Sequence, residues 1–268
     1  MSLGKQVRLN RIFAHESGRL SSVAVDHFIM YTKGQLPPGL KTMRRTLELV
    51  VAGKPDAVTM HRGVASHFWG RHAGEVPFIL QSSLIQIDDS VREQIADPED
   101  AVRLGADAFA VAAFVRGATE GLYLRTVADA VKMAERLEMP VITHIYPRRL
   151  YKELSVSFEP EDIAWAVHCA YECGTDVVKV PYCNDVSAYS QIISECPVPV
   201  VAAGGPKTSS FEEALTMLKG VVESGARGAT VGRNVWGVEK VTEAVRALKL
   251  VIHDRKSPRE AMVEAGIA

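Results

Sequence analysis

Residues 176–182 read Asp-Val-Val-Lys-Val-Pro-Tyr, a run of β-branched apolar residues that a single lysine interrupts. A continuous apolar run is typical of a parallel strand that is buried on both faces. Burial disfavours the charged form of Lys179, and a neutral amine is a nucleophile toward carbonyl carbons. The segment therefore indicates Schiff-base chemistry on a ketone or an aldehyde. The alternative interpretation is a lysine that reaches a carboxylate at the rim, such as Asp176 or Asp185.

Similar short apolar runs recur along the chain and predict eight strands. The predicted strands are 22–25, 57–60, 78–81, 108–112, 141–144, 177–180, 200–203 and 228–231. Longer stretches with apolar residues at helical spacing lie between them. The clearest of these helical stretches are 40–51, 120–137, 161–172, 186–194, 211–224 and 238–251.

This alternation predicts an α/β fold, specifically a (β/α)8 TIM barrel. Gly105, Gly174 and Gly225 each precede a predicted strand, as glycines at helix C-termini do. No linker or low-complexity tract divides the chain, so residues 1–268 are expected to form one barrel domain with short N- and C-terminal extensions. An open doubly wound sheet would need a glycine-rich loop after the first strand, where this chain has Asp26-His27.

Composition and charge exclude several classes of function. The chain has 268 residues, 47% of them hydrophobic, and a formal net charge of -1, so we expect one large core and no nucleic-acid footprint. No run approaches the roughly 20 apolar residues of a membrane span, and the N-terminus lacks the apolar region of a signal peptide. The four cysteines form no CxxC pair. We expect a cytoplasmic protein with no membrane partner.

Polar residues gather where the predicted strands end. In a barrel, the C-terminal ends of the parallel strands converge on one mouth, where active sites are built. The residues expected at this mouth are Asp26, His27, His61, Gln81, His144, Tyr146 and Lys179. This collective pattern is stronger evidence for an active site than any one of its members.

Two glycine segments follow the last two predicted strands, Gly204-Gly205-Pro206-Lys207 and Gly232-Arg233-Asn234. Glycines leave backbone N–H groups exposed, and the second segment is expected to open a short helix toward an anion. The loops after strands seven and eight are the usual phosphate site of a barrel. Lys207 and Arg233 could add charge-assisted hydrogen bonds. The alternative is that the glycines serve only tight turns.

Three further residues have two interpretations each. Asp26 could hold the Lys179 ammonium or accept protons from a carbinolamine, but it could also cap a helix. Tyr146 could move a proton during C–C bond cleavage, or it could pack at the rim. Arg148 could bind an anionic group of the substrate or remain solvated.

The histidines raise the question of a metal site. His27, His61, His67, His72 and His144 include several that are expected near the mouth. Carboxylate ligands are scarce at the ends of predicted strands two to five, so a metal site is not expected. The lysine mechanism itself needs no cofactor beyond the covalent Schiff base.

Five motifs together carry a family resemblance. They are Ala24-Val25-Asp26-His27, Tyr146-Pro147-Arg148, Val178-Lys179-Val180-Pro181-Tyr182, Ala203-Gly204-Gly205-Pro206-Lys207-Thr208 and Val231-Gly232-Arg233-Asn234-Val235-Trp236. With them the chain resembles the archaeal-type class I fructose-bisphosphate aldolases. That group also contains the autoinducer-2 phosphate thiolases and the aminodideoxyheptulosonate synthases. The resemblance covers most of the barrel and is strongest over residues 141–237.

The resemblance implies a metal-independent (β/α)8 barrel with Lys179 as the Schiff-base lysine. It further implies that Tyr146 is the general acid/base, that Asp26 assists it, and that the family's large rings, often decamers, could form here. The phosphate of the substrate would be held by Gly204, Gly205, Lys207, Gly232 and Arg233. The chain departs from the family at Phe28, where glycine is usual, and at His144, where the bisphosphate aldolases tend to carry tryptophan.

We therefore expect a class I aldolase that acts on a phosphorylated ketose. Lys179, Tyr146, Asp26 and His144 are the expected catalytic residues, and His27 and Arg148 join the glycine segments in substrate binding. One alternative is a lysine-dependent transferase or thiolase on the same scaffold. Others are a metal-dependent lyase or isomerase and a non-catalytic sugar-phosphate-binding barrel.

Overall fold

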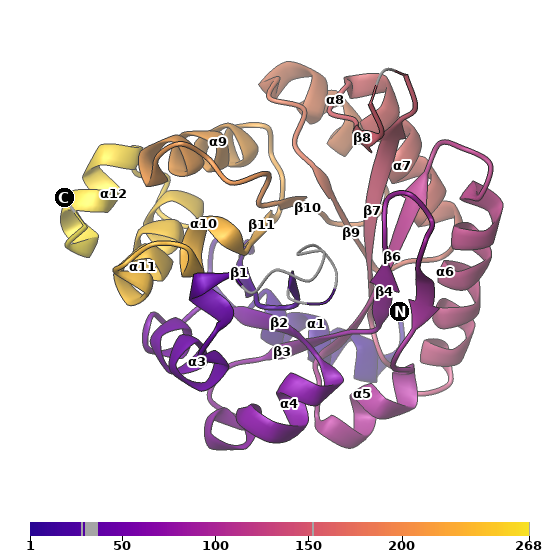
Figure 1. The fold of residues 1–268 in the computed structure, drawn as a ribbon, viewed down its shortest axis with the longest axis horizontal. Coiled ribbons are helices and arrows are strands. Elements are labelled where there is room, and N and C mark those ends of the chain that lie inside the picture. Colours follow the sequence, from indigo (N-terminus) through magenta and orange to yellow (C-terminus); the bar gives the residue numbers. More distant parts are fainter. Residues whose placement is uncertain (28, 30–36, 152, 268) are drawn as a thin grey trace.

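The computed structural model describes residues 1–27, 29, 37–151 and 153–267, and its parallel strands close into a barrel (Figure 1). The barrel strands are β1 (Leu20–Ala24), β2 (Ala57–His61), β3 (Phe78–Gln81), β6 (Ala108–Val115), β7 (Val141–Arg149), β9 (Val177–Pro181), β10 (Val200–Ala203) and β11 (Gly228–Val231). β1 pairs with both β2 and β11, and β6 pairs with both β3 and β7, so the ring is closed. The predicted (β/α)8 TIM barrel is confirmed.

Helices form the outer layer of the barrel (Figure 1). The described helices are α1 (Leu3–Ile12), which lies at one end of the barrel and not in this layer, and α3 (Met43–Ala52), α4 (Arg62–Phe68), α5 (Pro98–Leu104), α6 (Glu120–Glu135), α7 (Pro160–Glu172), α8 (Val186–Glu195), α9 (Phe211–Glu223), α10 (Arg233–Trp236), α11 (Val241–Ile252) and α12 (Pro258–Ala265). Two 3₁₀ turns, η1 (Pro38–Leu40) and η2 (Trp69–His72), complete the set. Gly105 and Gly174 follow α5 and α7 at φ values of 74° and 89°, which confirms their predicted role as helix-ending glycines.

The strands are buried on both faces, and alternate residues serve different cores. In β9, Val178 and Val180 pack in the large cluster between the strands and the helices. Val177 belongs instead to the cluster inside the barrel. Because side chains alternate along a strand, Lys179 shares the inward face with Val177. The lysine therefore enters the barrel interior, with the valines of the other face anchoring its strand.

The helix α1 supplies part of the inner cluster at the end of the barrel away from the mouth. Its Leu9 and Ile12 pack against Leu20 and Ile79, and Figure 1 draws α1 faint behind the strands. Full burial of one such aliphatic side chain stabilises the fold by about 1.5–3 kcal/mol. Lys5 of the same helix makes a 2.9 Å ion pair with Asp176, at the start of β9.

Short antiparallel strands project from the mouth. β4 (Ser83–Ile85) and β5 (Arg92–Gln94) form a hairpin after β3, and β8 (Ser155–Val156) pairs with the end of β7. None of the three is part of the predicted strand set. They matter because both segments contribute walls to the cavity described below. None of the helices described is long and apolar enough to cross a membrane.

Candidate active site

A cavity of about 350 Å³ opens at the C-terminal ends of the barrel strands. Its walls come from the loop after β1, the β4–β5 hairpin, β6, β7, the β8 segment, β9 and the loops after β10 and β11. Most of the predicted site residues line it: Asp26, His27, Tyr146, Lys179, Gly204, Gly205, Gly232 and Arg233. The barrel thus brings together groups that lie up to about 200 residues apart in the sequence, as the strand-end pattern predicts.

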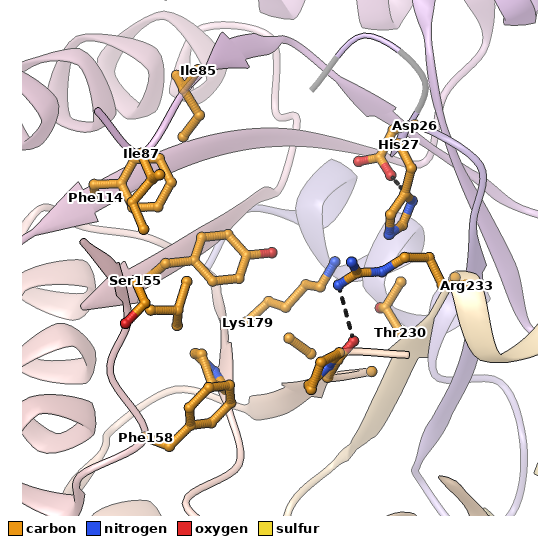
Figure 2. Close-up of a pocket in the computed structure, with 18 of the residues that line it drawn as sticks. Asp26, His27, Ile85, Ile87, Phe114, Ser155, Phe158, Lys179, Thr230 and Arg233 are labelled. Carbon is orange, nitrogen blue, oxygen red and sulfur yellow. Dashed lines mark hydrogen bonds and ion pairs between the residues drawn. The ribbon is translucent and has the colours of Figure 1, made fainter. Parts of the chain in front are cut away.

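Lys179 is only 5% exposed and projects into this cavity (Figure 2). It pairs in register with His144 of β7 on one side and with Val201 of β10 on the other. Its strand is rigidly held between two neighbours, so the amine is presented at a fixed depth below the mouth. The geometry suits attack on a carbonyl carbon that is bound in the cavity.

The alternative partners of this lysine are occupied elsewhere. The carboxylate of Asp176 accepts hydrogen bonds from the Lys5 ammonium at 2.9 Å and 3.0 Å and from the Val141 backbone N–H at 2.8 Å. Asp185 caps α8 by accepting from the Ala188 backbone N–H. The structure therefore does not match the interpretation of Lys179 as a rim lysine paired with either acid.

Asp26 is the buried anion of the site. Its Oδ1 lies 3.1 Å from Nδ1 of His27, and its Oδ2 lies 3.4 Å from the Gln81 amide nitrogen. Burial alone would raise the pKa of Asp26, but the hydrogen bond and charge of His27, together with the charge of Lys179, hold it well below its ordinary value. The carboxylate is thus ionised beside the lysine at neutral pH.

The buried side chain of Gln81 contacts both Asp26 and His144. The Ser83 backbone N–H donates to Oε1 of Gln81 at 2.9 Å, which fixes the orientation of the amide. Nε2 of Gln81 must then donate to Nδ1 of His144, at 3.0 Å, so the His144 proton resides on Nε2. Burial, and next the charge of Lys179, lower the pKa of His144 well below its ordinary value. His144 is a neutral imidazole of defined tautomer.

His144 does not line the cavity, although it neighbours Lys179 in the sheet. The structure shows it hydrogen-bonded to Gln81 beneath the cavity, and its predicted catalytic role stays a prediction. His61 is a support for the site, because its ring bridges the backbone oxygens of Gln81 and Asp26 at 3.1 Å each. The role of Gln81 itself was detectable in the sequence only as a polar residue at a strand end.

The two glycine segments meet on the side of the cavity where His27 lies. Asn234 ties them together, because its Nδ2 donates to the backbone oxygens of Gly204 and Pro206 at 3.2 Å and 3.0 Å. A side chain at Gly204 would come within 3.0 Å of the Thr230 oxygen, and one at Gly232 would overlap the His27 ring. Arg233 extends into the cavity beside them (Figure 2) and donates to the Gly205 oxygen at 3.4 Å. Its Nε is buried without a hydrogen-bond partner among the described residues.

Two predicted substrate ligands lie elsewhere. Arg148 is 4% exposed, and its guanidinium is held by Asp89 at 2.7 Å, Thr119 at 2.8 Å and the Arg116 oxygen at 2.9 Å. It braces the loop after β6 and does not line the cavity, and its contact with substrate stays a prediction. Lys207 is exposed and lines a neighbouring hollow that shares Arg233 with the cavity.

The remaining predictions concern metals and Phe28. Among the residues that the structure describes, no group of three or more His, Cys, Asp or Glu side chains could hold a metal ion. Phe28, the departure that follows Asp26-His27, lies outside the described residues.

Comparisons with known proteins agree with this geometry. The model of the DeoC/LacD aldolase family matches residues 20–237. The chain is 30% identical to 2-amino-3,7-dideoxy-D-threo-hept-6-ulosonate synthase of Halobacterium salinarum over 98% of this chain and 97% of that protein. It is also 30% identical to the class 1 fructose-bisphosphate aldolase of Thermoproteus tenax, over 94% of this chain and 96% of that protein.

A solved structure is similar over nearly the whole barrel. It is an archaeal fructose-1,6-bisphosphate aldolase whose catalytic lysine is covalently bound to the carbinolamine intermediate of the substrate. The two structures superpose with a TM-score of 0.80 at 28% identity, over 93% of this chain and 99% of that one.

Proposed function

Because this chain belongs to the DeoC/LacD family of aldolases, we propose that it is a class I aldolase that cleaves or forms a C–C bond in a phosphorylated ketose through a Schiff base on Lys179. The observation that carries the proposal is the position of Lys179, buried on the inward face of β9 and projecting into the cavity that the paired glycine segments line. An amine, an ionised carboxylate and an anion-binding wall are the groups that this chemistry needs in one place.

The first half of the reaction forms the iminium. Nζ of Lys179 adds to the keto carbon, the carbinolamine loses water, and the resulting C=N⁺ carries a positive charge. Asp26 is ionised and buried nearby, so it stabilises that charge. His144 is neutral, so it adds no positive charge that would oppose the developing cation.

The second half breaks the C–C bond. A base removes the proton of the C4 hydroxyl, the C3–C4 electron pair moves to the iminium nitrogen, and an aldehyde leaves. Tyr146 is assigned as this base because its side chain, on β7, lines the same cavity as Lys179. Protonation of the remaining enamine and addition of water release a dihydroxyacetone-phosphate-like product. General acid–base assistance of this kind contributes about 10²–10⁴-fold in rate.

The phosphate of the ketose is assigned to the wall of Gly204, Gly205, Gly232 and Arg233. Glycines allow close approach of the backbone to an anion, and the guanidinium of Arg233 adds charge-assisted hydrogen bonds. This placement puts the phosphate on one side of Lys179 and leaves the other side of the cavity for the aldehyde portion.

Borohydride trapping tests the proposal. The protein is incubated with dihydroxyacetone phosphate or with ketose phosphates, reduced, digested, and analysed by mass spectrometry. We expect one stable adduct, on Lys179. Lys179→Met should abolish it, whereas Lys219→Met, on an exposed lysine of α9, should leave it unchanged. Absence of any adduct on Lys179 in the folded, unmodified protein contradicts the proposal. An adduct that persists in a folded Lys179→Met protein also contradicts it.

A second candidate is a transferase or synthase reaction that uses the same lysine. It is favoured by the similarity to a protein named as a synthase, the Halobacterium relative. Product analysis distinguishes the two, because an aldolase releases a free aldehyde from a ketose phosphate alone. A transferase releases product only when a second acceptor, such as coenzyme A, is present. A non-catalytic sensor would bind sugar phosphate without turnover, and its Lys179→Met variant would still bind the sugar phosphate.

A further inference from the structure

The cavity has two chemically different sides, and Lys179 stands between them (Figure 2). On one side lie the charged groups Asp26, His27 and Arg233 with the glycine segments. On the other side lies a surface that we call the apolar wall, formed by Ile85, Ile87, Phe114, Val156 and Phe158. The two sides would contact the two halves of a ketose that is cleaved at the lysine.

The apolar wall is built mainly by the β4–β5 hairpin and by the β8 segment at the mouth of the barrel. Ile85 and Ile87 come from the β4–β5 hairpin, and Val156 and Phe158 come from the β8 segment. Phe114 completes the wall and packs against Tyr146, with 6.0 Å between ring centroids. Gln86 and Ser155 add uncharged polar groups. Among the described lining residues, this side of the cavity carries no charged side chain.

The arginines nearest to the apolar wall are held away from the cavity. Arg116 makes a 2.9 Å ion pair with Asp162, Arg148 a 2.7 Å pair with Asp89, and Arg149 a 3.2 Å pair with Glu159. None of the three lines the cavity. Among the residues described around this side, none offers a cation to a second phosphate, and burying an unpaired phosphate in an apolar environment is unfavourable.

On the basis of the proposed function, on which this step rests, we propose that the substrate is a ketose monophosphate whose carbon chain beyond the cleaved bond is uncharged and largely apolar. In the synthetic direction, the enamine carbon formed on Lys179 adds to the carbonyl carbon of an apolar aldehyde. The aldehyde oxygen takes up a proton, and water then releases the new ketose phosphate from the lysine. The apolar wall selects the aldehyde, whereas the glycine segments bind the phosphate of the donor.

The test measures aldol addition with dihydroxyacetone phosphate as the donor and a pair of acceptors, 3-methylbutanal and glyceraldehyde 3-phosphate. We expect kcat/KM to be at least about tenfold higher for the apolar acceptor, because a site that leaves a buried charge unpaired discriminates strongly. The trapped adduct of the donor on Lys179 is measured in parallel, so that donor activation and acceptor choice are separate readouts.

A variant that changes the wall sharpens the test. Val156→Lys places a cation in the apolar wall and should shift the ratio of kcat/KM values toward glyceraldehyde 3-phosphate by about tenfold or more. The matched control is Val263→Lys on α12, where the valine is 62% exposed, and it should leave the ratio unchanged. Both variants should still trap the donor on Lys179.

The outcomes separate the two proposals. A normal donor adduct with equal or better use of glyceraldehyde 3-phosphate overturns the substrate class and leaves the aldolase proposal standing. A Val156→Lys protein that traps the donor but keeps the wild-type ratio also overturns it, because the wall would then not contact the acceptor. Loss of the donor adduct in the unmodified protein overturns the aldolase proposal itself and, with it, this inference.

Discussion

Replacing Gln81 by leucine should damage both stability and the chemical step. Gln81 is fully buried, donates to His144 at 3.0 Å and accepts from the Ser83 N–H at 2.9 Å. Each of these two buried partners left without its hydrogen bond costs about 1–3 kcal/mol, so Gln81→Leu should lower the free energy of unfolding by about 2–6 kcal/mol. The long 3.4 Å contact to Asp26 adds less. Urea unfolding followed by circular dichroism measures this change.

The kinetic effect should fall on kcat. Without Gln81, neither the His144 tautomer nor the position of the Asp26 carboxylate is fixed, and misplacement near the reacting atoms costs about 10²-fold in rate. The phosphate wall is untouched, so KM for the ketose phosphate should change little. The matched control is Ser82→Ala, which removes buried hydrogen bonds to Gln94 and to the Ala110 oxygen outside the cavity. A Gln81→Leu enzyme with unchanged kcat, or with kcat and KM affected as in Ser82→Ala, would refute the positioning role.

Further predictions follow from the same contacts. Burial lowers the pKa of His144, so this side chain stays unprotonated in the folded protein at pH values where the unfolded chain protonates it, below about 6.5. The free energy of unfolding should therefore fall by up to about 1.4 kcal/mol per pH unit below that value. Urea unfolding at pH 7 and pH 5.5 measures the change. Gly232→Ala should raise KM for dihydroxyacetone phosphate at least about tenfold by displacing the His27 ring, whereas Gly70→Ala, in open space, should not. Arg148→Lys should lower the free energy of unfolding by about 1.5–3 kcal/mol without changing that KM. Incubation with EDTA should leave activity unchanged, and an EDTA-sensitive activity that returns with a divalent metal would contradict the lysine mechanism.

The barrel was largely predictable because buried parallel strands leave a direct trace in the sequence. The predicted strands 78–81, 200–203 and 228–231 coincide with β3, β10 and β11. The short strands β4, β5 and β8 were not predictable in the same way, because two or three residues are too few to show the spacing of apolar residues that marks a strand. These missed strands matter, because they and the residues next to them supply four of the five side chains of the apolar wall, Ile85, Ile87, Val156 and Phe158.

The candidate site was predictable where a residue's role depends on its place along its own strand. Lys179 follows from its strand alone, whereas the interactions of Gln81 reach Asp26 and His144, 55 and 63 positions away. Arg148 illustrates a role that local sequence does not reveal. Its position beside Arg149 favours an anion site, but Asp89, 59 positions away, neutralises it in the folded chain. Long-range pairing of this kind is decided by the fold, and no local pattern reports it.

The surroundings of Lys179 suggest why one buried amine can serve every step of the proposed reaction. The covalent intermediates between carbinolamine dehydration and hydrolysis alternate between a cationic iminium and a neutral enamine. Asp26 is ionised, because the hydrogen bond and charge of His27 and the charge of Lys179 hold its pKa low, so it stabilises a cationic intermediate without consuming a proton. His144 stays neutral for the opposite reason, burial beside a cation. Asp26 therefore supplies a fixed negative charge close to the reacting nitrogen, and proton transfer is left to Tyr146 and water at the open side of the cavity.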